Sequence, residues 1–507
     1  MESIKYDPCA PVVVGAEWSV YRTGGVPVIR PGFDGLLDRW SDIAERERRL
    51  GVCEGTPILI GPDGRVDARL AYFARRSAFA RLASSTQDSY LKDLRLFFTF
   101  LWSRGKSWDQ ADHEDIDDYE WWRRRSPDNP RRIGGAKWSR ELAAFVLLYD
   151  WAAGAGHLPR SPVLTHPARA RDGTTARAAD AAPRDVRTSN VKWVTPRTYR
   201  LWRDVGLGGY DRDGLPEPGW RGRNDGRNVA FADLLFDSGL RLKEAGCLLT
   251  VEVPHALSGH SYYEGTVAAA IAKRRERMFY VSAAALGRVA AYLATTRRAA
   301  VARARREGRY ERMTERRTVT VITRGKAPRI SWTDAHGGAG QAPVRVLAER
   351  ERRTLLIEGP DGLEPLWLWL ADSGLPLAFE SWEKVFAAAN ARCERRGVPV
   401  YVTPHMCRHS FALKMLVTLQ RAMDRRLGLD PAEREHLRQV YGDAFTLVRD
   451  LLGHRSEVTT RQIYLEPLSG LRLRGFLEDS EDLDEILAAV AASHRQVIDI
   501  DTAGTPR

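Results

Sequence analysis

His405, Arg408, His454 and Tyr464 lie between positions 403 and 464, where TPHMCRHSFALKML is followed by LLGHRSEVTTRQIY. A second arginine, Arg241, lies upstream in DSGLRLKEAGCLL. Tyrosine is a poor nucleophile at neutral pH because its phenol titrates near about 10. It becomes competent when a phosphate is neutralised and held in line with its hydroxyl. Arginine suits such a clamp, because its rigid fork of donors matches two phosphate oxygens. The pattern indicates metal-independent attack on a phosphodiester.

A proton donor must complete such a site, because the leaving sugar oxygen has to be protonated. His405 and His454 lie in the stretch itself, and Lys273 stands between it and Arg241, in AIAKRRERMFYVS. Two arginines around one phosphate could stabilise a pentavalent transition state, each donor contributing on the order of 3 kcal/mol. Taken singly, each motif has an ordinary explanation: H-x-x-R is usually a solvated helix face, and a lone tyrosine a packed aromatic. Only the combination favours chemistry.

The chain is basic and long enough for several domains. It has 507 residues, a net charge of +12 at pH 7 and an isoelectric point near 9.6. This balance fits nucleic acid or an anionic membrane as partner, but a solvated Arg-rich surface explains it equally well. Five scattered cysteines without a CxxC pair indicate neither disulfides nor a zinc site. We find no secretory signal and no apolar run near about 18 residues, so we expect an intracellular chain with no membrane association.

Composition and periodicity divide the chain into segments. Apolar residues recur at helical spacing in TQDSYLKDLRLFFTFLWSRG, with a stop expected at Gly105. The stretch after position 163 has almost no large apolar side chains, which is typical of a flexible linker. We expect an N-terminal extension of unassigned role at 1–64, a helical domain at 65–162, a linker at 163–192, a larger domain at 193–480, and a C-terminal helix with tail at 481–507.

The larger domain is predicted to be mainly helical with a small β-hairpin. Its strands are expected at 266–272 and 277–282 around a charged turn. An Arg-rich helix is expected at 297–317. It would either follow a phosphate backbone or form a solvated face with interspersed glutamates, and both interpretations stay open. The C-terminal helix would pack on its own domain or dock on a neighbouring protomer.

The motifs resemble those of the tyrosine recombinase (phage integrase) family. They occur in the family's order: an arginine box at Arg241 and Glu244, a hairpin lysine at Lys273, H-x-x-R at His405 and Arg408, LGH ending at His454, and a terminal tyrosine at Tyr464. The upstream helical segment, with TQDSYLKDLRLFFTFL and YDWAAGAGHLPRSPV, resembles the family's core-binding domain. The resemblance implies a helical, SAM-like core-binding domain followed by a mainly α catalytic domain.

The resemblance also implies how a phosphate would be held and attacked. Arg241, Arg408 and His454 would bind the scissile phosphate, and Tyr464 would form a 3′-phosphotyrosyl bond. Because that bond conserves the phosphodiester energy, the implied reaction needs neither ATP nor a metal, and no cofactor is expected.

The remaining implied roles concern proton transfer and support. His405 would assist proton transfer, and Lys273 would be the general acid toward the 5′ oxygen. Glu244 would be a buried partner of the arginine box, and His409 a supporting or core histidine. Further DNA contacts are expected from the arginines at Arg274, Arg275, Arg123, Arg124 and Arg125.

The implied partners are double-stranded DNA and further copies of the chain, four protomers on two DNA sites, with room for accessory proteins. The implied location is the bacterial cytoplasm, at the nucleoid. Two alternatives share the residue set: a topoisomerase or resolvase with the same chemistry, and a catalytically silent DNA-binding accessory protein. The spacings from Arg241 to His405, from His405 to His454 and from His454 to Tyr464 are all longer than in common members of the family.

Overall fold

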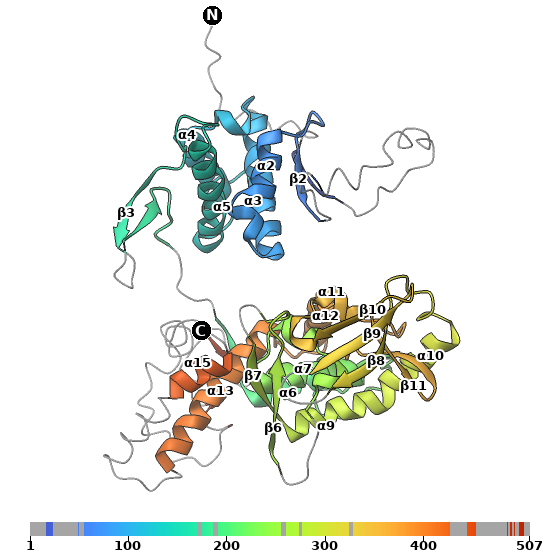
Figure 1. Cartoon of the computed structure of the whole chain (residues 1–507). Coiled ribbons are helices and arrows are strands. Elements are labelled where there is room, and N and C mark those ends of the chain that lie inside the picture. The colour runs from blue at the N-terminus through green and yellow to red at the C-terminus, as the bar shows by residue number, and fades with distance from the viewer. Residues whose placement is uncertain are drawn as a thin grey trace, which may run out of the picture. The chain divides into compact units, whose positions relative to one another are not determined.

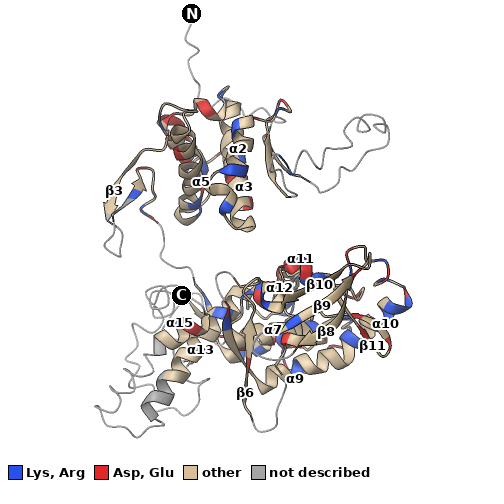
Figure 2. Ribbon diagram, viewed as in Figure 1, with Lys and Arg blue, Asp and Glu red and all other residues tan. Residues whose placement is uncertain are grey.

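The computed structural model divides the chain into two compact units, Met1–Arg187 and Thr188–Arg507 (Figure 1). The structure describes residues 17–23, 49, 55–169, 175–185, 191–254, 260–272, 276–323, 328–425, 444–452, 484, 487–488, 491 and 496–500. Lys and Arg occur on both units together with Asp and Glu (Figure 2). Within the described part of the chain, every helix is too short or too polar to cross a bilayer.

The first unit is a helical bundle with two small sheets at its edges. Its helices are α2 (Ala68–Arg76), α3 (Ser84–Ser103), α4 (His113–Arg124) and α5 (Gly135–Gly154), with 3-10 turns η2 (Ala78–Arg81) and η3 (Trp108–Gln110). The expected stop at Gly105 is confirmed, because this residue follows the helix with a left-handed φ of 71°. The long helices α3 and α5 run side by side (Figure 1) and enclose an aromatic core in which Phe97 lies 4.6 Å from Phe145, ring centre to ring centre.

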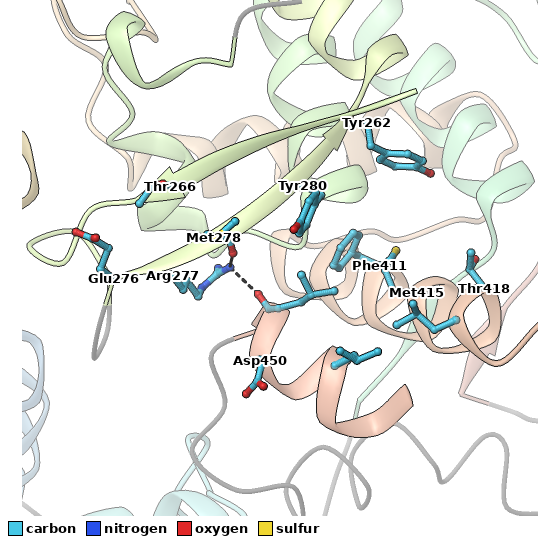
Figure 3. Close-up of a pocket in the computed structure, with 13 residues that line it drawn as sticks. Tyr262, Thr266, Glu276, Arg277, Met278, Tyr280, Phe411, Met415, Thr418 and Asp450 are labelled. Carbon is cyan, nitrogen blue, oxygen red and sulfur yellow. Dashed lines mark hydrogen bonds between the residues drawn. The ribbon is translucent and has the colours of Figure 1, made fainter. Parts of the chain in front are cut away.

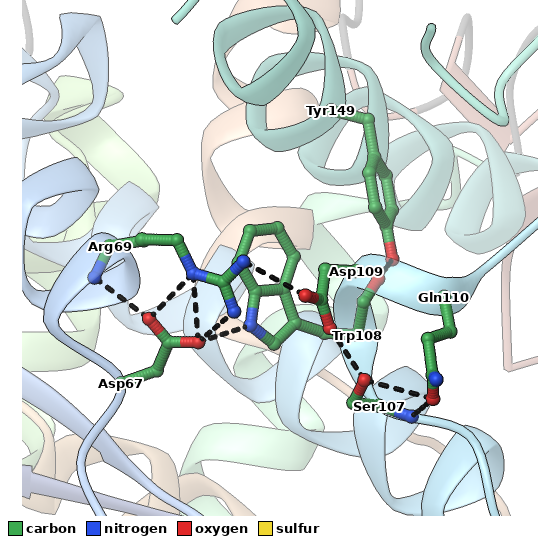
Figure 4. Close-up of polar contacts among 7 residues, drawn as sticks. All are labelled: Asp67, Arg69, Ser107, Trp108, Asp109, Gln110 and Tyr149. Carbon is green, nitrogen blue, oxygen red and sulfur yellow. Dashed lines mark hydrogen bonds and ion pairs between the residues drawn. The ribbon is translucent and has the colours of Figure 1, made fainter. Parts of the chain in front are cut away.

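Polar contacts join the start of α2 to η3 (Figure 4). The carboxylate of Asp67 caps α2 and accepts hydrogen bonds from Arg69 and from the indole nitrogen of Trp108 at 2.8 Å. Arg69 also pairs with Asp109 at 2.8 Å, and Tyr149 donates to the carbonyl of Trp108. Burial by itself would raise the pKa of Asp67, but these donors outweigh it and lower the pKa to about 2.

Segments expected to lie outside this domain contribute to it. β1 (Ser19–Arg22) pairs antiparallel with β2 (Pro57–Ile60), and the neighbouring Trp18 is buried in the same core. The expected extended linker contains an antiparallel hairpin, β3 (Thr165–Arg169) and β4 (Thr175–Ala179). Its continuation is fixed because Trp138 on α5 donates to the carbonyl of Ala181 at 2.8 Å. Part of the segment that was expected to be a flexible linker therefore has regular structure.

The second unit is built around helix α7 (Asp225–Ser238), which is buried along most of its length. Phe231 on this helix stacks on Trp382 with 3.6 Å between ring centres, and Phe236 stacks on Tyr199 at 3.8 Å. The surrounding helices are α6 (Pro196–Arg203), α8 (Leu242–Gly246), α9 (Ala283–Tyr292), α10 (Arg298–Arg306), α11 (Glu349–Arg353), α12 (Ser381–Arg395), α13 (Pro404–Arg425) and α15 (Ala444–Leu452). Short π segments are η4 (Asp204–Gly208) and η6 (Leu293–Arg297), and short 3-10 turns are η5 (Thr250–Glu252) and η7 (Val344–Val346). Because aromatic stacking fixes α7 on two sides, the residues that follow its carboxyl end are firmly placed.

The expected hairpin is present as β6 (Tyr262–Val267) and β7 (Arg277–Ser282). The second strand has the predicted bounds, whereas the first begins four residues earlier than predicted and ends at Val267. The hairpin's inner face, which includes Val267, Phe279 and Val281, is buried in the core of the unit.

A five-stranded sheet was not predicted. Its order is β10-β9-β8-β11-β12, with β8 and β11 parallel and the other pairs antiparallel. The strands are β8 (Arg317–Thr323), β9 (Arg329–Asp334), β10 (Ala339–Pro343), β11 (Leu355–Gly359) and β12 (Gly362–Pro365). The fold class is nevertheless as expected, mainly α with small β elements.

The Arg-rich helix was predicted to be longer than it is. α10 ends at Arg306, and Gly308 adopts a left-handed φ of 62° just beyond it. Several of its arginines face the protein: Arg303 pairs with Asp372 at 2.9 Å, and Arg305 donates to the carbonyls of Gly362 and Leu363. These contacts favour a structural role for this side of the helix.

The end of the chain returns to the start of the second unit. β13 (Val497–Ile498) pairs parallel with β5 (Trp193–Val194). Leu487 and Ala491 are buried in one cluster with Leu416 and other residues of α13, so this part of the C-terminal segment packs on its own chain.

Candidate active site

The arginine box begins where α7 ends. Gly239 takes a left-handed φ of 62°, and a Cβ there would lie 2.2 Å from the ring of Phe411 on α13. Glycine is therefore required both for the turn and for the close approach of α13. The chain then enters the short helix α8 with Arg241 as its N-cap residue. This turn brings Arg241 next to the helix that carries the H-x-x-R motif.

Glu244 is the buried centre of the site. Its side chain is 1% exposed and accepts from Arg241 twice, from the backbone N–H at 2.8 Å and from the guanidinium at 2.7 Å. A third donor is Arg277 on β7, at 2.5 Å. Burial alone would raise the pKa of Glu244, but Arg277, Arg241 and Arg408 hold it below its ordinary value. The carboxylate therefore stays ionised and orients the cations around it.

Three guanidinium groups donate hydrogen bonds to backbone carbonyls at the carboxyl end of α15. Arg241 donates to the carbonyl of Leu452 at 3.4 Å, and Arg408 donates to the same oxygen. Arg277 donates to the carbonyl of Leu451 at 2.7 Å. The last carbonyls of a helix have no partner within the helix and carry partial negative charge, so they attract cations.

Arg408 is deeply placed and Arg241 is not. Arg408 is 2% exposed and also donates to the carbonyl of Gly239, which ties α13 to the end of α7. The side chain of Arg241 is 27% exposed. Of these two predicted phosphate ligands, Arg241 has the more accessible cation.

The two histidines of α13 lie one turn apart. The rings of His405 and His409 are 4.1 Å apart, centre to centre, and nearly perpendicular at 78°. His405 is exposed, whereas His409 is 4% exposed and lies 6.5 Å from Trp193. His405 and Arg408 are three positions apart on one helix and so lie on neighbouring parts of its surface.

The other predicted site residues cannot be placed. Lys273, Arg274, Arg275, His454 and Tyr464 lie outside the described residues. The chain is described on both sides of the hairpin turn that carries the first three, and Leu452 lies two positions before His454 in the sequence. The arginine cluster therefore contacts the two segments that lead into these residues.

The predicted DNA contacts of the helical unit occupy different environments. Arg123 is buried and pairs with Glu141 at 2.9 Å, and Arg124 pairs with Glu120 and Asp185. Arg125 is 67% exposed. Burial argues against Arg123 as a DNA contact, because it forms an internal ion pair, and Arg125 is the best placed of the three to meet a ligand.

Arg277 was not among the predicted site residues. The sequence placed it beside Lys273 but offered no sign that it would reach Glu244, 33 positions earlier. Its signal was the strand alternation of RMFYVS, which turns Arg277 to the same face as the buried Phe279 and Val281. A charged residue on the inner face of a strand requires a buried partner.

A cleft of about 890 Å³ adjoins the cluster. Figure 3 shows it between the β6–β7 hairpin and helices α13 and α15, with Arg277 and its bond to Leu451 at one end. Its lining is largely apolar and includes Met278, Tyr280, Phe411 and Met415. Within the described ranges, no group of three or more His, Cys, Asp or Glu side chains is arranged to hold a metal ion.

The chain has low sequence identity to the known proteins that it resembles. No curated protein shows significant sequence similarity to this chain. Among solved structures, a XerH site-specific recombinase bound to difH substrate in a pre-cleavage complex is 12% identical, with a TM-score of 0.37 over 75% of this chain and 74% of that one. A post-cleavage XerH complex with a palindromic difH substrate is 13% identical, with a TM-score of 0.40 over 79% of this chain and 80% of that one. XerA recombinase is 15% identical, with a TM-score of 0.29 over 82% of this chain and 99% of that one.

The family comparison identifies the helical unit. Residues 73–156 match the family described as phage integrase, N-terminal SAM-like domain. This range runs from within α2 to just beyond the end of α5. The resemblance predicted for this part of the sequence is therefore confirmed for residues 73–156.

Proposed function

We propose that this chain is a tyrosine-type site-specific DNA recombinase that cleaves and rejoins DNA through a bond to Tyr464. The observation that carries the proposal is the convergence of Arg241 and Arg408 on the carbonyl of Leu452, with ionised Glu244 behind them. Two guanidinium groups held this close together favour the binding of a phosphate, because Arg241 is accessible to its oxygens and the buried charge of Arg408 adds to the attraction. The phage integrase SAM-like domain supports recombination over simple DNA binding.

The proposed reaction is a pair of phosphoryl transfers. The hydroxyl oxygen of Tyr464 attacks the scissile phosphorus as its proton passes to His405, the bond from phosphorus to the 5′ oxygen breaks, and Lys273 protonates that oxygen. Arg241, Arg408 and His454 stabilise the charge on the phosphate oxygens. A free 5′ hydroxyl from a second DNA then attacks the phosphotyrosine and releases the enzyme, so the number of phosphodiester bonds is unchanged.

Substrate and assembly are part of the proposal. The substrate is double-stranded DNA, and four protomers on two sites would perform the exchange, with accessory proteins as further partners. Arg274 and Arg275 would contact the DNA backbone beside the site.

The direct test is Tyr464→Phe, compared with the unaltered protein on a nicked suicide substrate that traps covalent adducts. We expect the wild-type protein to form an adduct, and the variant to form none while its DNA affinity stays within about twofold, because only one hydroxyl is lost. Sequencing the trapped DNA ends would define the target site. Adduct formation by the variant would refute Tyr464 as nucleophile, and a two-site exchange assay would separate recombination from relaxation alone.

A further inference from the structure

Arg277 contacts separate parts of the second unit, and it has no part in the reaction proposed above. It opens strand β7, and its side chain is 5% exposed. One end of its guanidinium meets Glu244 at 2.5 Å, and the other meets the carbonyl of Leu451 at 2.7 Å (Figure 3). It thus connects the hairpin, the arginine box and α15, which are far apart in the sequence.

A cation is costly at such a buried position. Burial lowers the pKa of Arg277 and Glu244 opposes this, but the guanidinium keeps its charge because arginine titrates above about 12. Replacing a buried ion pair by apolar residues is often neutral for stability, so packing alone does not require arginine here. What only arginine supplies is a planar fork that reaches two acceptors in fixed directions.

Arg277 and the groups that it contacts lie close in the sequence to proposed catalytic residues. In the sequence, Lys273 lies four positions before Arg277, which is preceded directly by Glu276. Leu451 lies three positions before His454 in the sequence. Glu244 orients Arg241 through two hydrogen bonds. The Arg277 guanidinium therefore contacts the carboxylate that orients Arg241 and the end of α15, and Arg277 itself begins strand β7.

We propose that Arg277 is a positioning residue that sets the β6–β7 hairpin, Glu244 and the carboxyl end of α15 relative to one another. It does not touch the reacting atoms. It keeps Glu244 ionised and fixes strand β7 and the end of α15, which lie close in the sequence to the proposed catalytic residues Lys273 and His454. The inference rests on the proposed function and deepens it, because it adds a residue to the support of the same site.

The test compares Arg277→Met and Arg277→Lys with the wild-type full-length protein, using single-turnover cleavage of the suicide substrate as a function of pH. Glu244 is faced by Arg241 from the start of α8, Arg277 from β7 and Arg408 from α13. Removing one of these cations raises the pKa of Glu244, and a protonated Glu244 loses its hold on Arg241. We expect Arg277→Met to slow cleavage roughly 10- to 100-fold at neutral pH. In the pH profile of this variant, the fall of the cleavage rate on the acid side should move to a pH about 1–3 units higher than in the wild type. The DNA affinity should stay within about twofold of that of the wild type.

Arg277→Lys retains the charge and should restore most of the acid-side limb, but only part of the rate, because an ammonium group cannot serve both acceptors in the same plane. This variant also keeps the test decisive if Arg277→Met fails to fold.

The matched control is Arg297→Met. Arg297 is also buried in the second unit, donates to the carbonyls of Pro365 and Trp367, and lies 3.6 Å from the carboxylate of Glu364. Its loss should lower thermal stability without moving the acid-side limb of the folded fraction.

An acid-side limb of Arg277→Met that coincides with that of the wild type would overturn the proposal, and so would a full wild-type cleavage rate in Arg277→Lys, whatever the thermal stability of the variants. If the wild-type protein forms no covalent adduct, it is the proposed function that fails, and this result is separate from any effect of Arg277.

Discussion

Each unit contains a buried carboxylate held by arginine, and the two clusters differ in one respect. In the helical unit, Arg123 directs its donors at Glu141 and at the carbonyl of Arg131, and the two side chains are 8% and 0% exposed. In the second unit, Glu244 is equally buried, but Arg241 is 27% exposed. The Arg123–Glu141 pair itself is buried, although Glu141 also meets Lys137, whose side chain is 31% exposed, whereas in the second cluster the arginine itself reaches the surface. The accessibility of the arginine therefore distinguishes the two clusters.

The largest expected effect on stability comes from breaking the Arg123–Glu141 pair. Arg123→Met would leave Glu141 buried with only Lys137, at 3.0 Å, as a cationic partner. We expect a loss of about 3–5 kcal/mol from the free energy of unfolding of the helical unit. Chemical denaturation of the full chain, together with hydrogen exchange of α4 and α5, would measure it. Arg125→Met, two positions away on an exposed side chain, should change stability by less than about 0.5 kcal/mol. Equal losses in the two variants would contradict the distinction.

A substitution in the Arg241–Glu244 cluster should reduce cleavage strongly and stability only slightly. Arg241→Ala leaves Glu244 paired with Arg277, so we expect the loss of stability to be small. Single-turnover cleavage should fall about 10²- to 10³-fold, as when one charge-stabilising donor is removed from a transition state. Arg223→Ala is a suitable control, because Arg223 is 81% exposed just before the start of α7, at the end remote from Arg241. Unchanged cleavage by Arg241→Ala would remove Arg241 from the site.

The sequence could predict the features that depend on neighbouring residues, but not those that depend on contacts between distant parts of the chain. The helix that stops at Gly105, the strand at Arg277–Ser282 and the burial of Glu244 depend on neighbours within a few positions or on a recognisable motif. The pairing of Arg123 with Glu141 depends on the packing of α4 on α5, and RRR alone resembles a basic surface. The five-stranded sheet was missed because its short strands, such as GLEP and AGQAP, show no alternation of apolar and polar residues.

The same reasoning explains the candidate site. Arg241, Glu244 and Arg408 could be named from motifs, and the structure brings them together through Gly239 and the end of α15. The partners of Arg277 could not be named, because they lie 33 positions earlier and 174 positions later. Sequence motifs identify residues that act on a substrate more readily than residues that hold them in place.

A smaller effect is expected from Asp67, whose pKa of about 2 lies below its ordinary value of 3.8. A lowered pKa in the folded state means that its contribution to stability is complete above about pH 5 and is lost as the pH falls through 2. Because the group is partly exposed, we expect this contribution to be on the order of 1 kcal/mol. Asp67→Asn should remove it at neutral pH and flatten this part of the acid dependence of the helical unit. Asp128→Asn, at an exposed position, serves as the control, and an acid dependence unaffected by Asp67→Asn would contradict the assignment.

The smallest effect, on DNA affinity, tests whether accessibility predicts function in the helical unit as well. Arg125 is 67% exposed and 3.9 Å from Glu120, so its charge is available to a phosphate. If it contacts the DNA backbone, Arg125→Ala should weaken binding a few-fold without regard to sequence and reduce the slope of log affinity against log salt by about 0.9. Arg125→Lys keeps the charge and should leave that slope unchanged. An unchanged slope in Arg125→Ala would mean that this arginine is simply solvated, and exposure would then mark function only where, as at Arg241, a buried carboxylate orients the cation.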